Sequence, residues 1–324
     1  MIDYSLRISK DIVRKLMTKN INNLVKAWYS FKDYQYIWFW SVYFVDFILF
    51  HKILWINNMI SFEKDNIDRP SFNRPYDFIH VVQWLFSEKF ETEVDFSKNL
   101  ILWLDYEASL KNDIIQDIDN IVRYKITAGS ILIFTFNCKI PGCEFEKKID
   151  YIDKFWDEWH IYLKKNISNS WDEIIYREPT KEDIIKENQL EKRYLEILQW
   201  KIENCLRDNN LQYKLLFSYS YKDSAKMVSI WFLFDNKENI EKIENIYDSE
   251  QGFINIEVPI LTLREKKQID QNIEALKNIL SSEKEDKQKR KEIKKILNFQ
   301  LEINEVKSYI TYHSEYPHFA EIVV

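Results

Sequence analysis

Acidic residues follow two short apolar segments of the chain, at the points where each segment ends. Glu63 comes directly after residues 59–62, and Asp105, followed by Tyr106, comes after residues 100–104. If both segments are parallel strands, their carboxyl ends lie at one edge of a sheet, where doubly wound folds bind their ligands. A carboxylate there can accept hydrogen bonds from the hydroxyls of a ribose, and we expect this role for Glu63.

A turn at Trp38-Phe39-Trp40-Ser41 should complete this site. It ends an apolar segment at residues 34–39 and precedes residues 44–54, whose apolar positions recur at helical spacing. Strand, tight turn, helix and an acid-terminated strand form the start of a nucleotide-binding βαβ unit. Such a turn needs glycine, because only glycine tolerates positive φ and leaves no side chain between backbone and ligand. As written, two indoles would fill the ligand's space.

Other polar residues near this turn each have a functional and a structural interpretation. Asp105 and Tyr106 should face the same crevice as Glu63, where Asp105 could orient a substrate hydroxyl or simply cap a helix. Asp46, one turn into the helix after the turn, could reach the loop or lie in solvent. His51 could act as a general base, but a histidine beside Lys52 on a helix is more often structural or solvated.

Composition and charge restrict the class of protein. The chain has 324 residues, of which 46% are hydrophobic and 30% charged, so it should be globular and not disordered. Its net charge of −6 is spread over mixed acids and bases and provides no basic footprint, so we expect no nucleic-acid partner. The aromatic stretch at residues 36–60 is interrupted by Asp46, His51 and Lys52, so we expect no membrane span.

The cysteines and the amino terminus indicate a cytoplasmic protein. Cys138, Cys143 and Cys205 form no even disulfide framework and fit a reducing compartment. No second ligand pair accompanies Cys138 and Cys143, so we expect no zinc site. The first residues, MIDYSLRISKDIV, lack the basic and apolar regions of a signal peptide.

The order of the predicted elements indicates an α/β fold. Apolar strands at residues 34–39, 59–62, 78–82, 100–104 and 130–136 alternate with helical patterns, most clearly at residues 112–124, which predicts a doubly wound, mostly parallel sheet. Residues 65–75 read as a loop, and residues 141–165 and 181–207 as helices. Residues 213–221 and 227–234 then predict an antiparallel strand pair at one edge of the sheet.

The predicted elements divide the chain into three parts. Residues 1–30 should be a helical leader, residues 31–265 a Rossmann-like domain, and residues 266–324 a helical carboxyl-terminal extension packed on it. The extension contains a long helical stretch at residues 272–306 with the charge run SSEKEDKQKRKEIKK, which we expect to be a solvated helix or loop.

The glycine and tryptophan contents are both unusual. The chain has 3 glycines, where average usage predicts on the order of twenty, and it has 11 tryptophans. Abundant Lys, Asn, Ile, Tyr and Phe suggest an AT-rich gene, which would reduce both residue types. We therefore hypothesise that the source lineage reads UGA as glycine and that this sequence was translated with UGA as tryptophan. The alternative is a divergent protein that is truly rich in aromatic residues.

Several stretches together resemble one known family. The segments IWFWSVYFVDFILFHKILWINNMISFEKD, RPSFNRPY, LWLDYEASL, GSILIFTFN, YKDSAKMVSIWFLF, PILTLREKK and YHSEYPHFAEIVV are similar to bacterial proteins described as putative O-methyltransferases. The resemblance covers most of the chain. The family's pattern has glycine where this chain has tryptophan at a set of positions, whereas tryptophan belongs at Trp103; the set is Trp28, Trp38, Trp40, Trp55, Trp84 and Trp231.

The resemblance implies a class I methyltransferase-like fold with S-adenosylmethionine as cofactor. Carried over, the glycine motif falls on Trp38, Phe39, Trp40 and Ser41, the ribose acid on Glu63, and the fourth-strand motif on Asp105 and Tyr106. Asp105 and Tyr106 are also the residues that we expect at the reacting centre.

Three functions stay open on this basis. The first is methyl transfer to an unknown acceptor. The second is a catalytically inactive Rossmann-like scaffold, which genuine tryptophans at positions 38 and 40 would favour. The third, a nicotinamide-dependent oxidoreductase, is disfavoured by the antiparallel strand pair and by the absence of a third glycine position in the loop.

Overall fold

A computed structural model describes residues 7–39, 43–64, 67–83, 86–106, 110, 112–138, 187–207, 209–222, 225–244 and 252–317. The contacts of the chain cluster into two compact units. The larger unit consists of residues 21–220 and 224–254, and the smaller one of residues 1–20, 221–223 and 255–324. The predicted helix at residues 141–165, Trp40, Ser41 and Trp84 lie outside the described residues.

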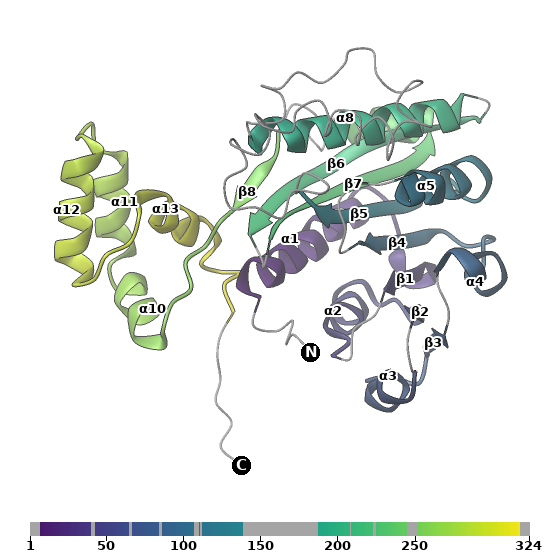
Figure 1. Ribbon diagram of the computed structural model, residues 1–324, viewed down its shortest axis with the longest axis horizontal. Coiled ribbons are helices and arrows are strands. Elements are labelled where there is room, and N and C mark those ends of the chain that lie inside the picture. The colour runs from purple at the N-terminus through teal and green to yellow at the C-terminus, as the bar shows by residue number, and fades with distance from the viewer. Residues whose placement is uncertain are drawn as a thin grey trace, which may run out of the picture. The chain divides into compact units, whose positions relative to one another are not determined.

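The sheet has eight strands in the order β3-β2-β1-β4-β5-β7-β6-β8 (Figure 1). Strands β1 to β5 pair in parallel, and β7 pairs antiparallel with β5. The bounds are β1 Gln35–Phe39, β2 Asn58–Glu63, β3 Ile79–Gln83, β4 Leu100–Asp105, β5 Ile131–Asn137, β6 Leu211–Lys222, β7 Lys226–Asn236 and β8 Ile254–Ile256. The chain moves outward through β1, β2 and β3 and then returns to the other side of β1 with β4. This reversal is the topological switch point of a doubly wound fold.

One face of the sheet is covered by α5 (Asn112–Tyr124) and α8 (Glu187–Leu206), together with Phe90 of α4 (Phe86–Glu93). Helix α5 places Ile114, Ile118 and Ile121 at intervals of about one turn, so they form one apolar face that is fully buried against the strands. The strands contribute alternate residues to this core, because successive side chains of a strand point to opposite faces.

The other face is packed through aromatic rings by α2 (Val45–Leu54). Tyr36 of β1 contacts Phe47 and Phe50 of this helix, with ring centroids 5.2 and 4.4 Å apart. Trp38, two residues further along β1, contacts Phe47 at 5.9 Å. Helix α2 is therefore fixed on the first strand through Phe47 and Phe50, which lie one turn apart.

The structure differs from the sequence-based expectation at several elements. Residues 65–75, expected to be a loop, contain the short helix α3 (Asp68–Asn73). Helix α4 was not expected. The strand pair β6–β7 does not end the sheet, because β8 follows β6 at that edge.

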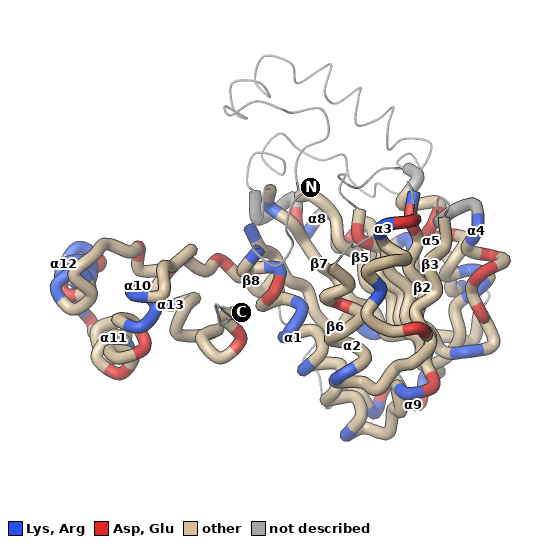
Figure 2. The backbone as a smooth tube through the Cα atoms, turned by 90° about the horizontal axis from the view of Figure 1, so that it is seen from below, with Lys and Arg blue, Asp and Glu red and all other residues tan. Residues whose placement is uncertain are grey.

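The smaller unit consists mainly of helices. It contains most of α1 (Ile8–Val25), followed late in the chain by α10 (Leu263–Asp270), α11 (Ile273–Ser281), α12 (Asp286–Leu297) and α13 (Ile303–Tyr312). The expected continuous helix at residues 272–306 is thus three helices. The charge run lies mostly on α12, which has six basic and two acidic residues and is dominated by Lys and Arg (Figure 2).

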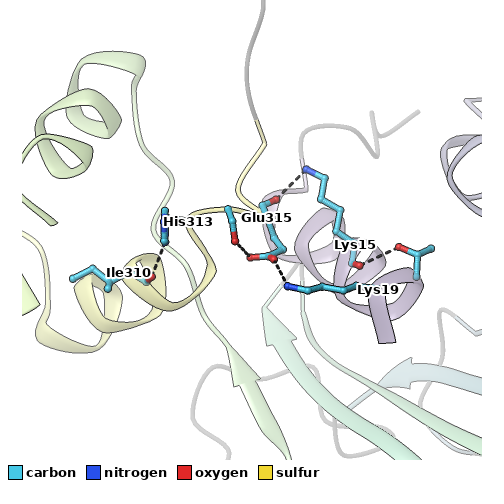
Figure 3. Close-up of polar contacts among 7 residues, drawn as sticks. Lys15, Lys19, Ile310, His313 and Glu315 are labelled. Carbon is cyan, nitrogen blue, oxygen red and sulfur yellow. Dashed lines mark hydrogen bonds and ion pairs between the residues drawn. The ribbon is translucent and has the colours of Figure 1, made fainter. Parts of the chain in front are cut away.

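The end of the described chain is tied to α1 within this unit (Figure 3). Lys15 Nζ donates to the main-chain oxygen of Glu315 at 2.9 Å, and Lys19 Nζ lies 3.3 Å from the carboxylate of Glu315. Further along, the Tyr316 hydroxyl donates to the carbonyl of Pro259 and accepts from the Leu261 amide. Residues more than 290 positions apart in the sequence are therefore joined in one unit.

Candidate functional site

Three of the predicted site residues lie at the carboxyl ends of neighbouring parallel strands. Phe39 ends β1, Glu63 ends β2 and Asp105 ends β4, and β1 lies between the other two in the sheet. The register pairs Phe39 with Phe62, next to Glu63, and Trp38 with Trp103. The sheet therefore brings these residues together at the switch point, as the sequence predicted.

Glu63 is a buried acid at this edge. Its residue is only 1% exposed, and its carboxylate accepts a hydrogen bond from Ser61 Oγ at 3.2 Å. Taking a carboxylate out of water is costly unless hydrogen-bond donors surround it. Two residues of one strand, Ser61 and Glu63, therefore place a buried, hydrogen-bonded carboxylate at the carboxyl end of β2.

Phe39 and Tyr106 form an aromatic pair above β1 and β4. Their rings meet edge to face with centroids 5.7 Å apart, and both side chains are half-buried. The hydroxyl of Tyr106 donates to Asp117 of α5 at 2.7 Å, and its amide donates to the carbonyl of Thr135 at 2.8 Å. The orientation of Tyr106 is thus fixed at both ends, so its ring can serve as a wall of a site.

Trp38 is packed in the core. It is 1% exposed, and its indole packs between Phe47 of α2 and Trp103 of β4, with a centroid distance of 5.6 Å to the latter. Its Nε1 is a buried donor without a hydrogen-bond partner in the described structure. Trp103 Nε1, in contrast, donates to Thr135 Oγ1 at 2.9 Å.

Asp46 was underestimated by sequence reasoning. It lies in the first turn of α2 and is fully buried, so its interpretation as a solvated residue is wrong. Helix N-termini favour negative charge because the first amide groups point outward. Helix α2 begins next to the turn after β1, so Asp46 joins Glu63 and Asp105 as a third acid near the switch point.

His51 lies at the opposite edge of the sheet. Its ring contacts Tyr76 and Phe78 at 4.5 and 4.9 Å, and Nδ1 is 3.1 Å from the carbonyl oxygen of Ile56. Ile56 precedes β2 and Phe78 precedes β3, so this histidine sits at the amino ends of the strands. The interpretation of His51 as a general base for this site is therefore wrong, and the structural one holds.

A family model described as "Putative O-methyltransferase" matches residues 2–324. No curated protein matches the chain. In the described part of the chain, no helix is long and apolar enough to cross a membrane.

Several solved structures resemble this chain distantly. Trm1 from Pyrococcus horikoshii, in complex with S-adenosyl-L-methionine, is 11% identical with a TM-score of 0.43; the match covers 72% of this chain and 57% of that one. The B. subtilis M1A22 tRNA methyltransferase TrmK is 9% identical with a TM-score of 0.32, over 90% of this chain and 97% of that one. An O-methyltransferase from Klebsiella pneumoniae, described as putative, is 8% identical with a TM-score of 0.32, over 72% and 91%.

Proposed function

The chain belongs to the putative O-methyltransferase family, and we propose that it binds S-adenosylmethionine and transfers a methyl group to an acceptor. The observation that carries this proposal is the buried Glu63 at the carboxyl end of β2, next to the strand-order reversal between β1 and β4. A carboxylate at that place is suited to accept hydrogen bonds from the hydroxyls of a ribose.

The described residues fit a nucleoside-containing cofactor in most respects. Glu63 would accept hydrogen bonds from the ribose hydroxyls, and the rings of Phe39 and Tyr106 would provide an apolar wall for the rest of the nucleoside. Asp46, at the start of α2, would accept hydrogen bonds from the cofactor's polar groups. The turn from Trp38 to Ser41 fits less well as written, since a turn that lets backbone approach a ligand needs glycine.

Methyl transfer is an in-line displacement, and the bound cofactor supplies the electrophilic methyl group. The chain's own residues then contribute mainly position, because correct alignment of two reactants removes much of the entropic barrier. We propose that Asp105 and Tyr106, at the end of β4, hold the acceptor next to the cofactor. The net charge of −6 favours an acceptor other than a nucleic acid.

Equilibrium dialysis of the purified chain against S-adenosylmethionine and, separately, against NAD tests the proposal. Binding of S-adenosylmethionine alone would support it. Binding of NAD in preference would replace it with an oxidoreductase, and binding of neither would leave a Rossmann-like scaffold. A chain whose tryptophans at positions 38 and 40 are changed to glycine should be tested beside the parent, since the turn is part of the proposed site.

A further inference from the structure

Three helices of the described chain are followed by a residue with a left-handed backbone. Trp28 follows α1 with φ 125°, Trp55 follows α2 with φ 61°, and Asn298 follows α12 with φ 63°. Among residues other than glycine, positive φ occurs in only a few per cent of cases and mostly in Asn and Asp. Two of the three residues here are tryptophan.

The hydrogen bonds show that these are helix-ending motifs. After α1, the Tyr29 amide donates to the Leu24 carbonyl and the Trp28 amide to the Val25 carbonyl, both at 3.2 Å, which is the Schellman pair of bonds. After α2, the Trp55 amide donates to the His51 carbonyl at 2.9 Å, which is the single bond of the αL motif.

The residue in this position is usually glycine and sometimes asparagine. Asn298 after α12 follows that rule, with its amide donating to the Lys294 carbonyl at 2.9 Å. Trp28 and Trp55 do not follow it. The rule exists because a Cβ atom crowds the backbone in a left-handed conformation. One non-tryptophan exception, Phe44 with φ 48°, stands before α2 and not after a helix.

Side-chain packing does not explain the two tryptophans. Trp55 is 70% exposed, so its indole gains little from burial, whereas Trp28 is 49% exposed and buries about half of its surface. Trp28 stacks on the buried ring of Tyr29 with centroids 5.6 Å apart, and the ammonium group of Lys242 lies over the Trp28 ring at the same distance. The backbone at positions 28 and 55 is thus that of glycine, with a large side chain added toward solvent.

Three buried tryptophans, Trp38, Trp103 and Trp231, separate into two kinds. Trp38 is buried with an unpartnered Nε1, as expected of a side chain placed where none belongs. Trp103 is buried with its Nε1 bonded to Thr135, and Trp231 in β7 donates to Ser229 Oγ at 3.2 Å. Nothing in the extended backbone at position 231 requires glycine, so the structure gives this position no support as a glycine.

We infer that residues 28 and 55 are glycine in the protein made by its source cell, and that residues 38 and 40 are glycine by the same reading of UGA. The first part stands on backbone geometry and is independent of the proposed function. The second part rests on the proposed function and on the family pattern: position 38 lies in the extended strand β1, where the structural support is the unpartnered buried Nε1 of Trp38, and position 40 lies outside the described residues.

The codons of the gene at positions 28, 38, 40, 55 and 103 provide the direct test, with peptide mass spectrometry of the protein from its own source as the protein-level readout. We expect UGA at the first four positions and UGG at 103, with peptides lighter by the difference between tryptophan and glycine. UGG at position 28 or 55, with tryptophan in the native peptide, would overturn the inference.

A second test uses the recombinant chain and does not depend on any ligand. Trp28→Gly with Trp55→Gly should raise the thermal unfolding midpoint, whereas Trp28→Ala with Trp55→Ala, which removes the indoles but keeps Cβ, should raise it less or not at all. Equal midpoints for the glycine and alanine pairs would contradict the inference. A stabilised glycine pair in a chain that never binds S-adenosylmethionine would leave this inference intact and remove the proposed function.

Discussion

Phe39 at the end of β1 and Tyr106 directly after β4 meet edge to face, with ring centroids 5.7 Å apart. These two strands are neighbours in the sheet but are separated in the sequence by β2 and β3. The pair therefore forms where the strand order reverses, and it joins the two halves of the proposed site. The Tyr106 hydroxyl donates to Asp117, so we expect the ring, and not the hydroxyl, to contact a ligand.

Tyr106→Phe and Tyr106→Ala should have separable effects. The phenylalanine variant loses the 2.7 Å hydrogen bond to Asp117 and should lose about 1 kcal/mol of unfolding free energy, with cofactor affinity nearly unchanged. The alanine variant also loses the wall that packs on Phe39 and should bind S-adenosylmethionine more weakly. Urea unfolding and calorimetric titration measure the two quantities; a phenylalanine variant that binds as weakly as the alanine variant would assign the binding role to the hydroxyl.

Glu63→Gln should weaken binding of S-adenosylmethionine roughly tenfold to a hundredfold, because a charge-assisted hydrogen bond contributes about 1.5–3 kcal/mol. The variant keeps the shape of the buried side chain beside Ser61. Glu93→Gln is the matched control, since Glu93 is paired with His80 at the surface. Unchanged affinity in Glu63→Gln, with the fold intact by circular dichroism, would remove Glu63 from the cofactor site.

Asp119 should make the packing of α5 on α8 sensitive to acid. Burial alone would raise the pKa of Asp119, but hydrogen bonds from Lys201, Arg123 and Cys205 outweigh it and hold the pKa below its usual value. A lowered folded pKa contributes stability at neutral pH, and this contribution is lost as the pH falls below about 4.

We therefore expect Asp119→Asn to lose about 1 kcal/mol of unfolding free energy at pH 7 and much less at pH 3. Urea unfolding of variant and parent at both pH values measures this difference. An equal loss of unfolding free energy at both pH values would show that the carboxylate charge of Asp119 is not the cause.

Burial and the neighbouring Asp119 also raise the pKa of Cys205 to about 12, so its thiol should react slowly with alkylating reagents at pH 8.

Asn298 offers a test of the helix-ending argument within α12 itself. Asn298→Gly should keep or slightly raise the stability of the smaller unit. Asn298→Ala should lower it by about 1 kcal/mol, because alanine is disfavoured in the left-handed backbone conformation and lacks the local hydrogen bonds of asparagine. Thermal unfolding followed by circular dichroism compares the two. If the alanine and glycine variants at position 298 were equally stable, the inference that positions 28 and 55 are glycine would be weakened as well.

Much of the sheet could be predicted from the sequence because its strands are short apolar runs between polar residues. Helix α5 was predicted with both of its bounds, since Ile114, Ile118 and Ile121 repeat at helical spacing without interruption. Helix α3 was missed because Pro70 and Asn73 are typical of loops, although proline is tolerated in a first helical turn, where its amide would lack a partner anyway.

Other features could not be read from a local pattern. The break between α11 and α12 contains neither glycine nor proline, and the one after α12 depends on the left-handed Asn298. The burial of Asp46 depends on how α2 packs against the sheet, which its spacing in the helix does not indicate. His51 has the chemistry of a base, but only the direction of α2 shows that it lies at the wrong edge.

The roles of Glu63, Asp105 and Tyr106 remain predictions, as do the domain bounds. Trp40 and Ser41 lie outside the described residues, whereas Trp38 and Phe39, expected in the turn, are the last two residues of β1. Sequence reasoning placed the proposed site residues at strand ends, because strand ends can be located from apolar runs. It could not find how each side chain is oriented, because that depends on tertiary packing.

The central claim is that this chain is a methyltransferase with its cofactor at the carboxyl ends of β1, β2 and β4. The most direct measurement is calorimetric titration of S-adenosylmethionine into the chain with Trp38→Gly and Trp40→Gly, beside the parent and a Trp28→Gly, Trp55→Gly control. We predict saturable binding to the first variant, and weaker but measurable binding to the parent and to the control. A folded first variant that binds no S-adenosylmethionine would contradict the account.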